Sequence, residues 1–400
     1  MQTLKNRSAS WAIAAGIALL ALCLFWSTRI TEQSIDKDGA QNLTLAFNLL
    51  HHGVASLDGA APYGPSMYRE PLPVVTTAIA MAATEAVLGP APLDDYQSGT
   101  RAMLVKRQNV VWAALLVVST FWAACLLTSS RILGVLAASL VCFDSVPLAA
   151  SGIDAIGLDS LATDLPAAAL LMGGSALLLA AWRTRRLSCF VLAGVCIGLL
   201  ALTKAAFLYV FAGVVVVLAG CEALKAGTVA FGPPLVRLAA LAAAFAAVVL
   251  PWMLRNYFEL GQFQLTERAG VVLLVRAMQD GMTAEEYRGA FFAWAPATLQ
   301  PVVGRMLGFS RADLRRGARL QRLNREHDSG FYAEDLAAES GGKPENAITY
   351  YRKARAERVR LERLAKASGQ SDAGIDRLLR ERALALIEQR PLRHFAMTPL

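Results

Sequence analysis

The chain has 400 residues, of which 55% are hydrophobic and 18% charged, and its formal net charge is +8 at pH 7. The apolar residues are gathered into long runs before about residue 254, and charged residues are more frequent after that point. This bunching excludes an ordinary soluble enzyme and predicts an all-α, polytopic membrane protein. Residues 1–254 form the predicted transmembrane module, and residues 255–400 form a polar, helical, extramembrane region.

The first apolar run, residues 11–27, follows the basic residues Lys5 and Arg7. A secretory signal peptide begins in the same way, but no small-residue cleavage site follows this run. We therefore expect an uncleaved first span. Its basic N-terminal end should lie in the cytoplasm, because positive charge beside a span favours that side.

Seven more apolar runs follow, and several are near the lower length limit for crossing about 30 Å of hydrocarbon. The run 73–88 is short, opens with prolines and contains Glu85, so we expect it to lie at the outer face as a juxtamembrane helix. Without it, the basic loop 183–186 falls in the cytoplasm, as the distribution of Lys and Arg in short loops requires. Seven crossings with an external loop, residues 28–109, are then expected. The remaining predicted crossings are 110–128, 132–148, 165–181, 189–203, 205–220 and 236–253.

This topology has one disadvantage. It places Arg101, Lys106 and Arg107 outside, whereas Lys and Arg close to a span favour the cytoplasmic side. It also makes the C-terminal region external. That region carries 24 Lys and Arg against 18 Asp and Glu, or +6 of the net charge. Helices are predicted over 346–366 and 375–389. Their basic surface would suit anionic lipid headgroups or lipopolysaccharide, and a merely solvated helical face explains the composition equally well.

Lys204 lies within an apolar stretch, where an isolated ammonium costs several kcal/mol unless another group compensates its charge. In the predicted topology it gathers with acidic residues at the outer ends of the helices. Simpler explanations exist: Asp164 can be a helix N-cap, Lys204 can extend to the membrane interface, and Arg255 can be an interfacial anchor. Their convergence on one face favours a functional site. The acids expected there are Asp36, Asp38, Glu70, Asp144, Asp154, Asp159, Asp164 and Glu267.

Carboxylates beside cations at the level of the headgroups suit transfer of a group from a lipid-linked phosphate. A base must take a proton from the acceptor hydroxyl. Cations must neutralise the departing phosphate. A wet site at the membrane surface would let a lipid-borne donor meet a polar acceptor.

Four stretches resemble the bacterial GT-C glycosyltransferases. The nearest likeness is to the polyprenyl-phosphate-sugar-dependent group that includes protein mannosyltransferases and the lipid A aminoarabinose transferase. In that family an acidic residue follows the first span, and an amphipathic helix and a junction with aromatic, charged and proline residues come next. The order and spacing of the motifs carry the resemblance, which covers residues 1–270. The four stretches are 36–53 with 68–73, 161–171, 198–208, and 250–263 with 266–270.

The resemblance implies a role for several side chains. Asp38 would be the general base, and Asp164 would orient the acceptor or help to bind a metal. Lys204 would pair with the lipid phosphate. Arg69 or Glu70 occupies the junction where the family places charge.

Other implied roles are less specific. Arg255 and Arg268 would be further contacts to phosphate or sugar. Asp36 with Asp38 could bind Mg²⁺ or Mn²⁺ through oxygen ligands, or Asp36 could simply be solvated. Gly39 stands where a second acid is common and Asn42 where tyrosine is common, so the metal requirement and the identity of the base stay open.

The resemblance therefore implies an integral glycosyltransferase of the inner membrane. It would move a sugar, with inversion, from a polyprenyl-phosphate donor to a periplasmic lipid, glycan or protein; membrane lipids are further expected partners, and nucleic acid is not. The N-terminus would be cytoplasmic and the C-terminal region periplasmic. Family members usually have more spans, so a short or truncated member is expected. Two alternatives remain: a non-catalytic GT-C-like partner subunit, and a secondary transporter, against which the loop position of the acids argues.

Overall fold

The computed structural model describes residues 16–150, 157–226, 233–267, 269–295, 299–326, 329–368 and 372–397. Within these residues all regular structure is helical and no β-strand occurs, which confirms the predicted all-α fold. The chain divides into two compact units, Met1–Thr266 and Glu267–Leu400. The division expected at residue 254 falls inside helix α10, Pro233–Leu260.

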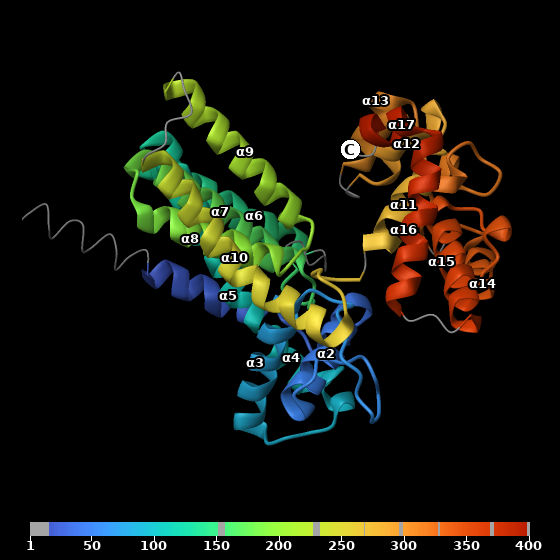
Figure 1. Ribbon diagram of the computed structural model, residues 1–400, viewed down its shortest axis with the longest axis horizontal. Coiled ribbons are helices and arrows are strands. Elements are labelled where there is room, and N and C mark those ends of the chain that lie inside the picture. Colours follow the sequence, from blue (N-terminus) through green and yellow to red (C-terminus); the bar gives the residue numbers. More distant parts are fainter. Residues whose placement is uncertain are drawn as a thin grey trace, which may run out of the picture. The chain divides into compact units, whose positions relative to one another are not determined.

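The apolar helices of the N-terminal unit pack side by side (Figure 1). α5 contacts both α6 and α7, α7 contacts α8, and α8 contacts α10, while α9 lies against α8 and α10. A shorter helix, Gly16–Ser27, precedes them. The bounds are α5 Gln108–Thr128, α6 Arg131–Ala150, α7 Asp164–Thr184, α8 Leu187–Ala201 and α9 Phe207–Ala226.

Two glycines allow α8 to approach α10 closely. A Cβ atom on Gly194 would lie 2.3 Å from the Leu241 carbonyl oxygen, and one on Gly198 would lie 2.8 Å from the Val248 Cβ. Both distances are far inside van der Waals contact. The Gly-x-x-x-Gly spacing therefore removes side chains where the two helix backbones meet, as in many membrane helix pairs.

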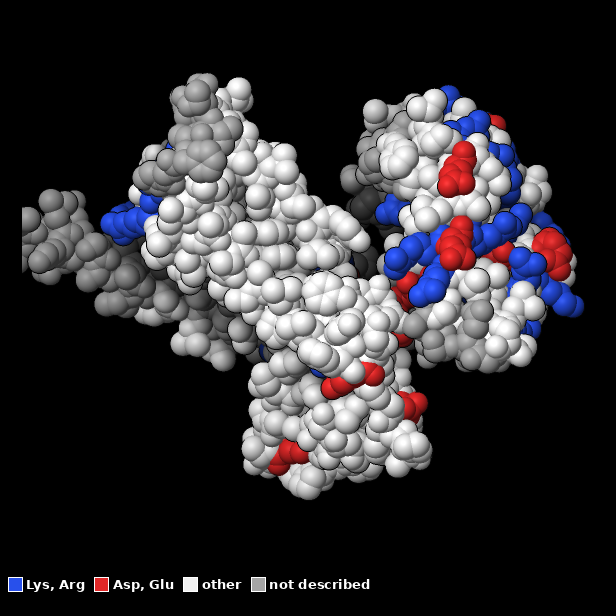
Figure 2. Space-filling view, viewed as in Figure 1, with Lys and Arg blue, Asp and Glu red and all other residues white. Residues whose placement is uncertain are grey.

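Five of the described helices are long and apolar enough to cross a membrane. On the face shown in Figure 2, the apolar helices of this unit are almost free of charged side chains. Both observations support a membrane-embedded protein. α3 (Pro71–Leu88) is among the five although we predicted a position beside the membrane, whereas α8, a predicted crossing, is shorter. Length and composition alone do not decide whether α3 or α8 crosses the membrane, so the seven crossings stay a prediction.

The loop between the first two predicted crossings folds into a small helical cap at one end of the apolar helices (Figure 1). Leu43, Met81 and Tyr96 lie in its buried core. Glu85 accepts a hydrogen bond from the Tyr96 hydroxyl at 2.7 Å, and its Oε1 lies 2.9 Å from His51 Nε2. The cap positions the loops of the predicted site. Its elements are α2 (Lys37–His52), α3, the 3₁₀ helix η1 (Leu93–Tyr96) and α4 (Gly99–Lys106).

The C-terminal unit is a second helical body with its own cores. The apolar helix α11 packs against α15 and α16, and α12 contacts α13. The predicted helices 346–366 and 375–389 correspond to α15 and α16. The helices are α11 Ala269–Gln279, α12 Ala284–Ala293, α13 Gln300–Leu307, α14 Tyr332–Gly341, α15 Tyr350–Ala367, α16 Asp372–Gln389 and α17 Pro391–Met397.

Many arginines of this unit are paired with its own carboxylates. Glu339 accepts hydrogen bonds from Arg352 and Arg355, which joins α14 to α15. Glu357 accepts from Arg360 at 2.7 Å and from Arg382 at 3.1 Å, which joins α15 to α16. These buried carboxylates therefore compensate part of the positive charge of the unit, which carries many blue side chains on the face shown in Figure 2.

Candidate functional site

The junction between α2 and α3 connects three other parts of the N-terminal unit. Its Ser66 carbonyl accepts a hydrogen bond from Arg255 Nη1 of α10 at 3.2 Å. Directly after the junction, Leu72 at the start of α3 donates its N–H to the carbonyl of Leu202, in the turn after α8, at 3.0 Å. Its Arg69 Nε donates to Asn42 Oδ1 of α2 at 3.1 Å. Three motifs that are distant in sequence are thus joined at one junction.

Asn42 extends these contacts to the loop before α7. Its amide is fully buried, and Nδ2 donates to the Leu161 carbonyl at 3.0 Å. Gly39 lies one turn earlier on α2, where an added Cβ would lie 3.0 Å from Ile35 Cγ2 and 3.4 Å from Leu161 Cβ. The residues at these two positions therefore have a structural reason: the glycine avoids a close contact with Ile35, and the asparagine fastens the loop before α7.

Arg69 and Asp38 form the first ion pair of the site. Arg69 Nη1 lies 2.9 Å from Asp38 Oδ2, with 1% of the arginine side chain and 57% of the aspartate side chain exposed. Nη1 is within ion-pair distance but is not aligned for a hydrogen bond to any described acceptor. The pair therefore holds a buried positive charge beneath a carboxylate that faces solvent.

Lys204 and Asp164 form the second ion pair. Lys204 Nζ lies 2.5 Å from Asp164 Oδ1, and the side chains are 37% and 76% exposed. Asp164 is the first residue of α7, whereas the N-cap is Thr163, so its carboxylate serves Lys204 rather than the helix cap. Such an exposed pair contributes only about 0–1 kcal/mol to stability. An incoming anion can therefore replace Asp164 at Lys204 at small energetic cost.

A third pair, Lys106 with Asp159, has the opposite character. Lys106 is fully buried, and its Nζ lies 2.7 Å from Asp159 Oδ1 and 3.1 Å from the Gln33 carbonyl. Asp159 also accepts hydrogen bonds from the N–H and hydroxyl of Thr31. Asp159 was expected at the outer face, but its pairing with Lys106 was not foreseen. The pair fastens α4 to the loop before α7 and compensates one of the three positive charges that made the expected topology unfavourable.

The other predicted residues are less closely joined. Arg255 pairs with Glu259 at 2.5 Å and lies over the ring of Trp252, so part of its positive charge is already compensated. Glu70 is the half-buried N-cap residue of α3, and among the described residues its carboxylate has no hydrogen bond or ion pair. Arg268 lies outside the described residues. So do Asp154 and the side chain of Asp144.

The proposed metal ligands fit a divalent cation poorly. Asp36 is the N-cap residue of α2, and Asp38 follows in its first turn. The guanidinium of Arg69, 2.9 Å from Asp38, already occupies the space beside that carboxylate with positive charge. Over the described ranges, no group of three His, Cys, Asp or Glu side chains is arranged to hold a metal ion.

The site thus combines two solvent-facing carboxylates, each in the first turn of a helix and beside a cation, and backbone and side-chain hydrogen bonds join the segments that carry them. Neither a comparison with protein-family models nor a search of curated protein sequences found a match. The chemical interpretation therefore depends on the motifs and on this geometry.

Proposed function

We propose that this protein is an integral membrane glycosyltransferase of the GT-C type, which moves a sugar from a polyprenyl-phosphate donor to an envelope lipid, glycan or protein. The observation that supports this best is the exposed Lys204–Asp164 pair, joined through Leu72 and Leu202 to the junction that carries Arg69 and Asp38. A phosphate-binding cation and two accessible carboxylates are the groups that this transfer requires.

In the proposed reaction, the donor phosphate replaces the Asp164 carboxylate at Lys204. The acceptor oxygen then forms a bond to the anomeric carbon, and the bond from that carbon to the phosphate oxygen breaks. The electron pair leaves with the phosphate, whose charge Lys204 neutralises. Asp38, held by Arg69, takes the proton of the acceptor hydroxyl, and the released Asp164 orients the acceptor.

The location in the membrane is part of the proposal. We propose an inner-membrane protein with a cytoplasmic N-terminus, seven crossings and a periplasmic C-terminal region. The buried Lys106–Asp159 pair supports an external position for the cap, because it neutralises one of the cations that the charge rule would keep inside. Cysteine labelling at residue 204 from either side of sealed vesicles tests the topology. Labelling only from the cytoplasmic side would contradict it.

The reaction is tested by incubating membranes that contain each variant with a labelled polyprenyl-phosphate sugar. Asp38→Asn, Asp164→Asn and Lys204→Met should each lower transfer by about 100-fold or more. Glu32→Gln is the matched control, since Glu32 is an exposed carboxylate in the external loop that accepts a hydrogen bond from Thr100 at 2.7 Å. Its transfer should be unchanged.

Other outcomes separate the alternatives. Full transfer by Asp38→Asn would remove Asp38 as the base, and full transfer by Lys204→Met would refute the phosphate site. Binding of the labelled donor without transfer in the unmodified protein would support a non-catalytic partner subunit. Uptake of the label into vesicles without transfer would support a transporter.

A further inference from the structure

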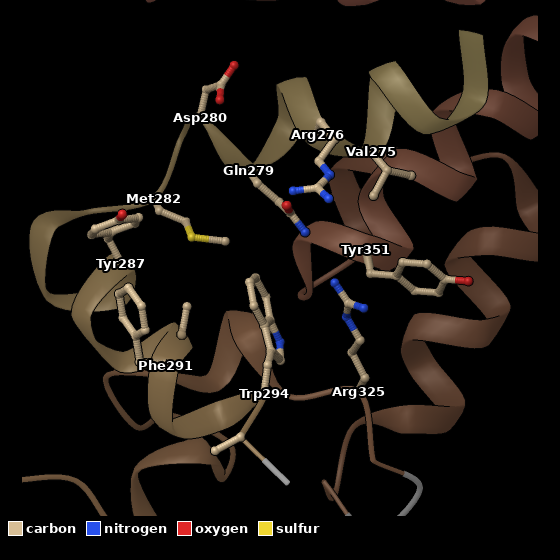
Figure 3. A pocket seen from close by; sticks show the side chains of 12 residues that line it. Val275, Arg276, Gln279, Asp280, Met282, Tyr287, Phe291, Trp294, Arg325 and Tyr351 are labelled. Atoms are coloured by element: carbon tan, nitrogen blue, oxygen red, sulfur yellow. The ribbon is translucent and has the colours of Figure 1, made fainter. Parts of the chain in front are cut away.

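The C-terminal unit contains a pocket of about 520 Å³ that the proposed transfer reaction does not use (Figure 3). α11 and α12 form two of its walls, and the segment around residue 325 and the start of α15 form the rest. Its volume lies within the range of roughly 300–1,000 Å³ that is usual for small-molecule sites. A ligand of one or a few rings would fit.

Arg325 gives the pocket a directed positive charge. Its guanidinium carbon lies 5.0 Å from the ring centre of Trp294 and 4.9 Å from that of Tyr351. Among the described residues it makes no hydrogen bond or ion pair, so its N–H groups are available to a ligand. Stacking of a guanidinium on aromatic rings leaves the in-plane donors free, which suits two-point binding of a carboxylate or phosphate.

A second guanidinium strengthens the preference for an anion. Figure 3 shows the side chains of Arg276 and Gln279 directed toward the same space as Arg325. Arg325 is exposed as a whole residue, but the partial burial of its guanidinium lowers its pKa. The nearby Tyr351 raises this pKa, and the positive charge of Arg276 lowers it further. A bound anion would relieve the repulsion between the two arginines.

The acidic residue of the pocket is already engaged. The side chain of Asp280 is 3% exposed, and its Oδ2 lies 2.9 Å from His394 Nδ1. In Figure 3 its carboxylate points away from the two arginines. The Asp280 carboxylate is therefore not directed at Arg325, and it does not compensate the charge of that guanidinium.

The rest of the lining indicates the body of the ligand. Tyr287, Phe291 and Trp294 supply aromatic surface, and Gln279 supplies an amide. Aromatic rings contact the C–H faces of sugars, while amide and guanidinium groups donate hydrogen bonds to hydroxyl and acidic oxygens. We infer that this pocket binds an acidic saccharide, that is, a sugar ring that carries a carboxylate or a phosphate. The inference does not depend on the transfer reaction proposed above.

Calorimetric titration of the full chain in detergent micelles tests this inference. The probes are glucuronate, glucose 6-phosphate, glucose, inorganic phosphate and a short glutamate peptide. The two acidic sugars should bind more tightly than glucose, phosphate or the peptide. Arg325→Gln should weaken their binding by about tenfold or more, because a charge-assisted fork is lost.

Two further variants keep the test decisive. Arg325→Lys keeps the charge but loses the planar fork, so it should also weaken binding even if Arg325→Gln folds poorly. Arg316→Gln is the control, because Arg316 forms an exposed ion pair with Glu334 in the same unit, and its binding should match that of the unmodified chain. Equal binding of glucose, phosphate or the peptide would overturn the inference. So would the absence of binding at millimolar concentrations, or unchanged affinity in both Arg325 variants.

Discussion

Replacement of Glu286 by glutamine should strongly destabilise the C-terminal unit. Glu286 is 2% exposed and accepts two hydrogen bonds from Arg322, at 2.6 Å and 2.7 Å. It also accepts from the Tyr350 hydroxyl at 3.0 Å and from the Thr283 N–H at 2.8 Å, where it completes a capping box at the start of α12. Glutamine has one acceptor oxygen instead of two, and its NH₂ group would face donors.

The expected loss can be estimated from these contacts. Hydrogen bonds to a charged group contribute about 1.5–3 kcal/mol each, and a neutral one about half of that. Because Arg322 is 42% exposed, water compensates part of its lost partner. We therefore expect Glu286→Gln to lower the free energy of unfolding by about 2–4 kcal/mol. With a urea dependence near 2 kcal/mol per M, the unfolding midpoint should fall by about 1–2 M.

The chain offers a matched control in Glu334. It also forms a two-point pair with an arginine, Arg316, with both distances 2.8 Å, but the two side chains are 58% and 54% exposed. Glu334→Gln should cost less than about 1 kcal/mol. Full-length protein in detergent, equilibrated in urea and given a brief protease pulse, reports the midpoint through survival of the C-terminal unit. Equal shifts for the two variants would refute the argument from burial.

Three further predictions concern other contacts. Gly194→Val should prevent α8 from packing on α10 and abolish a monodisperse peak in size-exclusion chromatography, whereas Gly213→Val should not, because open space surrounds a Cβ there. Lys106→Met should lower the free energy of unfolding, measured by thermal unfolding, by about 3–5 kcal/mol. Lys204→Met should change that free energy by less than about 1 kcal/mol. Equal effects of the two substitutions would contradict the distinction between buried and exposed pairs. Burial would raise the pKa of Glu286, but its hydrogen bonds outweigh burial and hold the pKa below the ordinary 4.5. This stabilisation is therefore complete above about pH 4.5 and is lost as the pH falls through the lower folded pKa, so acidification should lower the urea midpoint less in Glu286→Gln than in the unmodified chain.

Hydrophobic patterning predicted the helical fold well because apolar runs long enough to span a bilayer have few other stable structures. Helix ends were less predictable. α15 was expected from residue 346 but begins at Tyr350, because Asp335 accepts hydrogen bonds from the N–H groups of Ile348 and Thr349 and holds that segment extended. Such a contact between distant segments leaves no mark in the local pattern.

The same limit applies to the candidate site. Lys204 and Asp164 were expected to gather because each charge is conspicuous in an apolar setting, and the two side chains do meet. Lys106 and Asp159 are 53 residues apart, and the sequence around either residue does not indicate that the two side chains pair. The pocket around Arg325 was not foreseen, since it draws on four separate segments that only the tertiary fold brings together.

The pairing of arginines with carboxylates inside the C-terminal unit has a consequence for how the protein meets other macromolecules. Glu339 and Glu357 each bind two arginines, so several positive charges of this unit serve to hold α14, α15 and α16 together. This pairing leaves less positive charge available to polyanions than the number of arginines suggests. Raising the ionic strength should therefore weaken anion binding at an exposed arginine such as Arg325 more than it weakens these pairs, because Glu339 and Glu357 are buried and buried pairs are screened less.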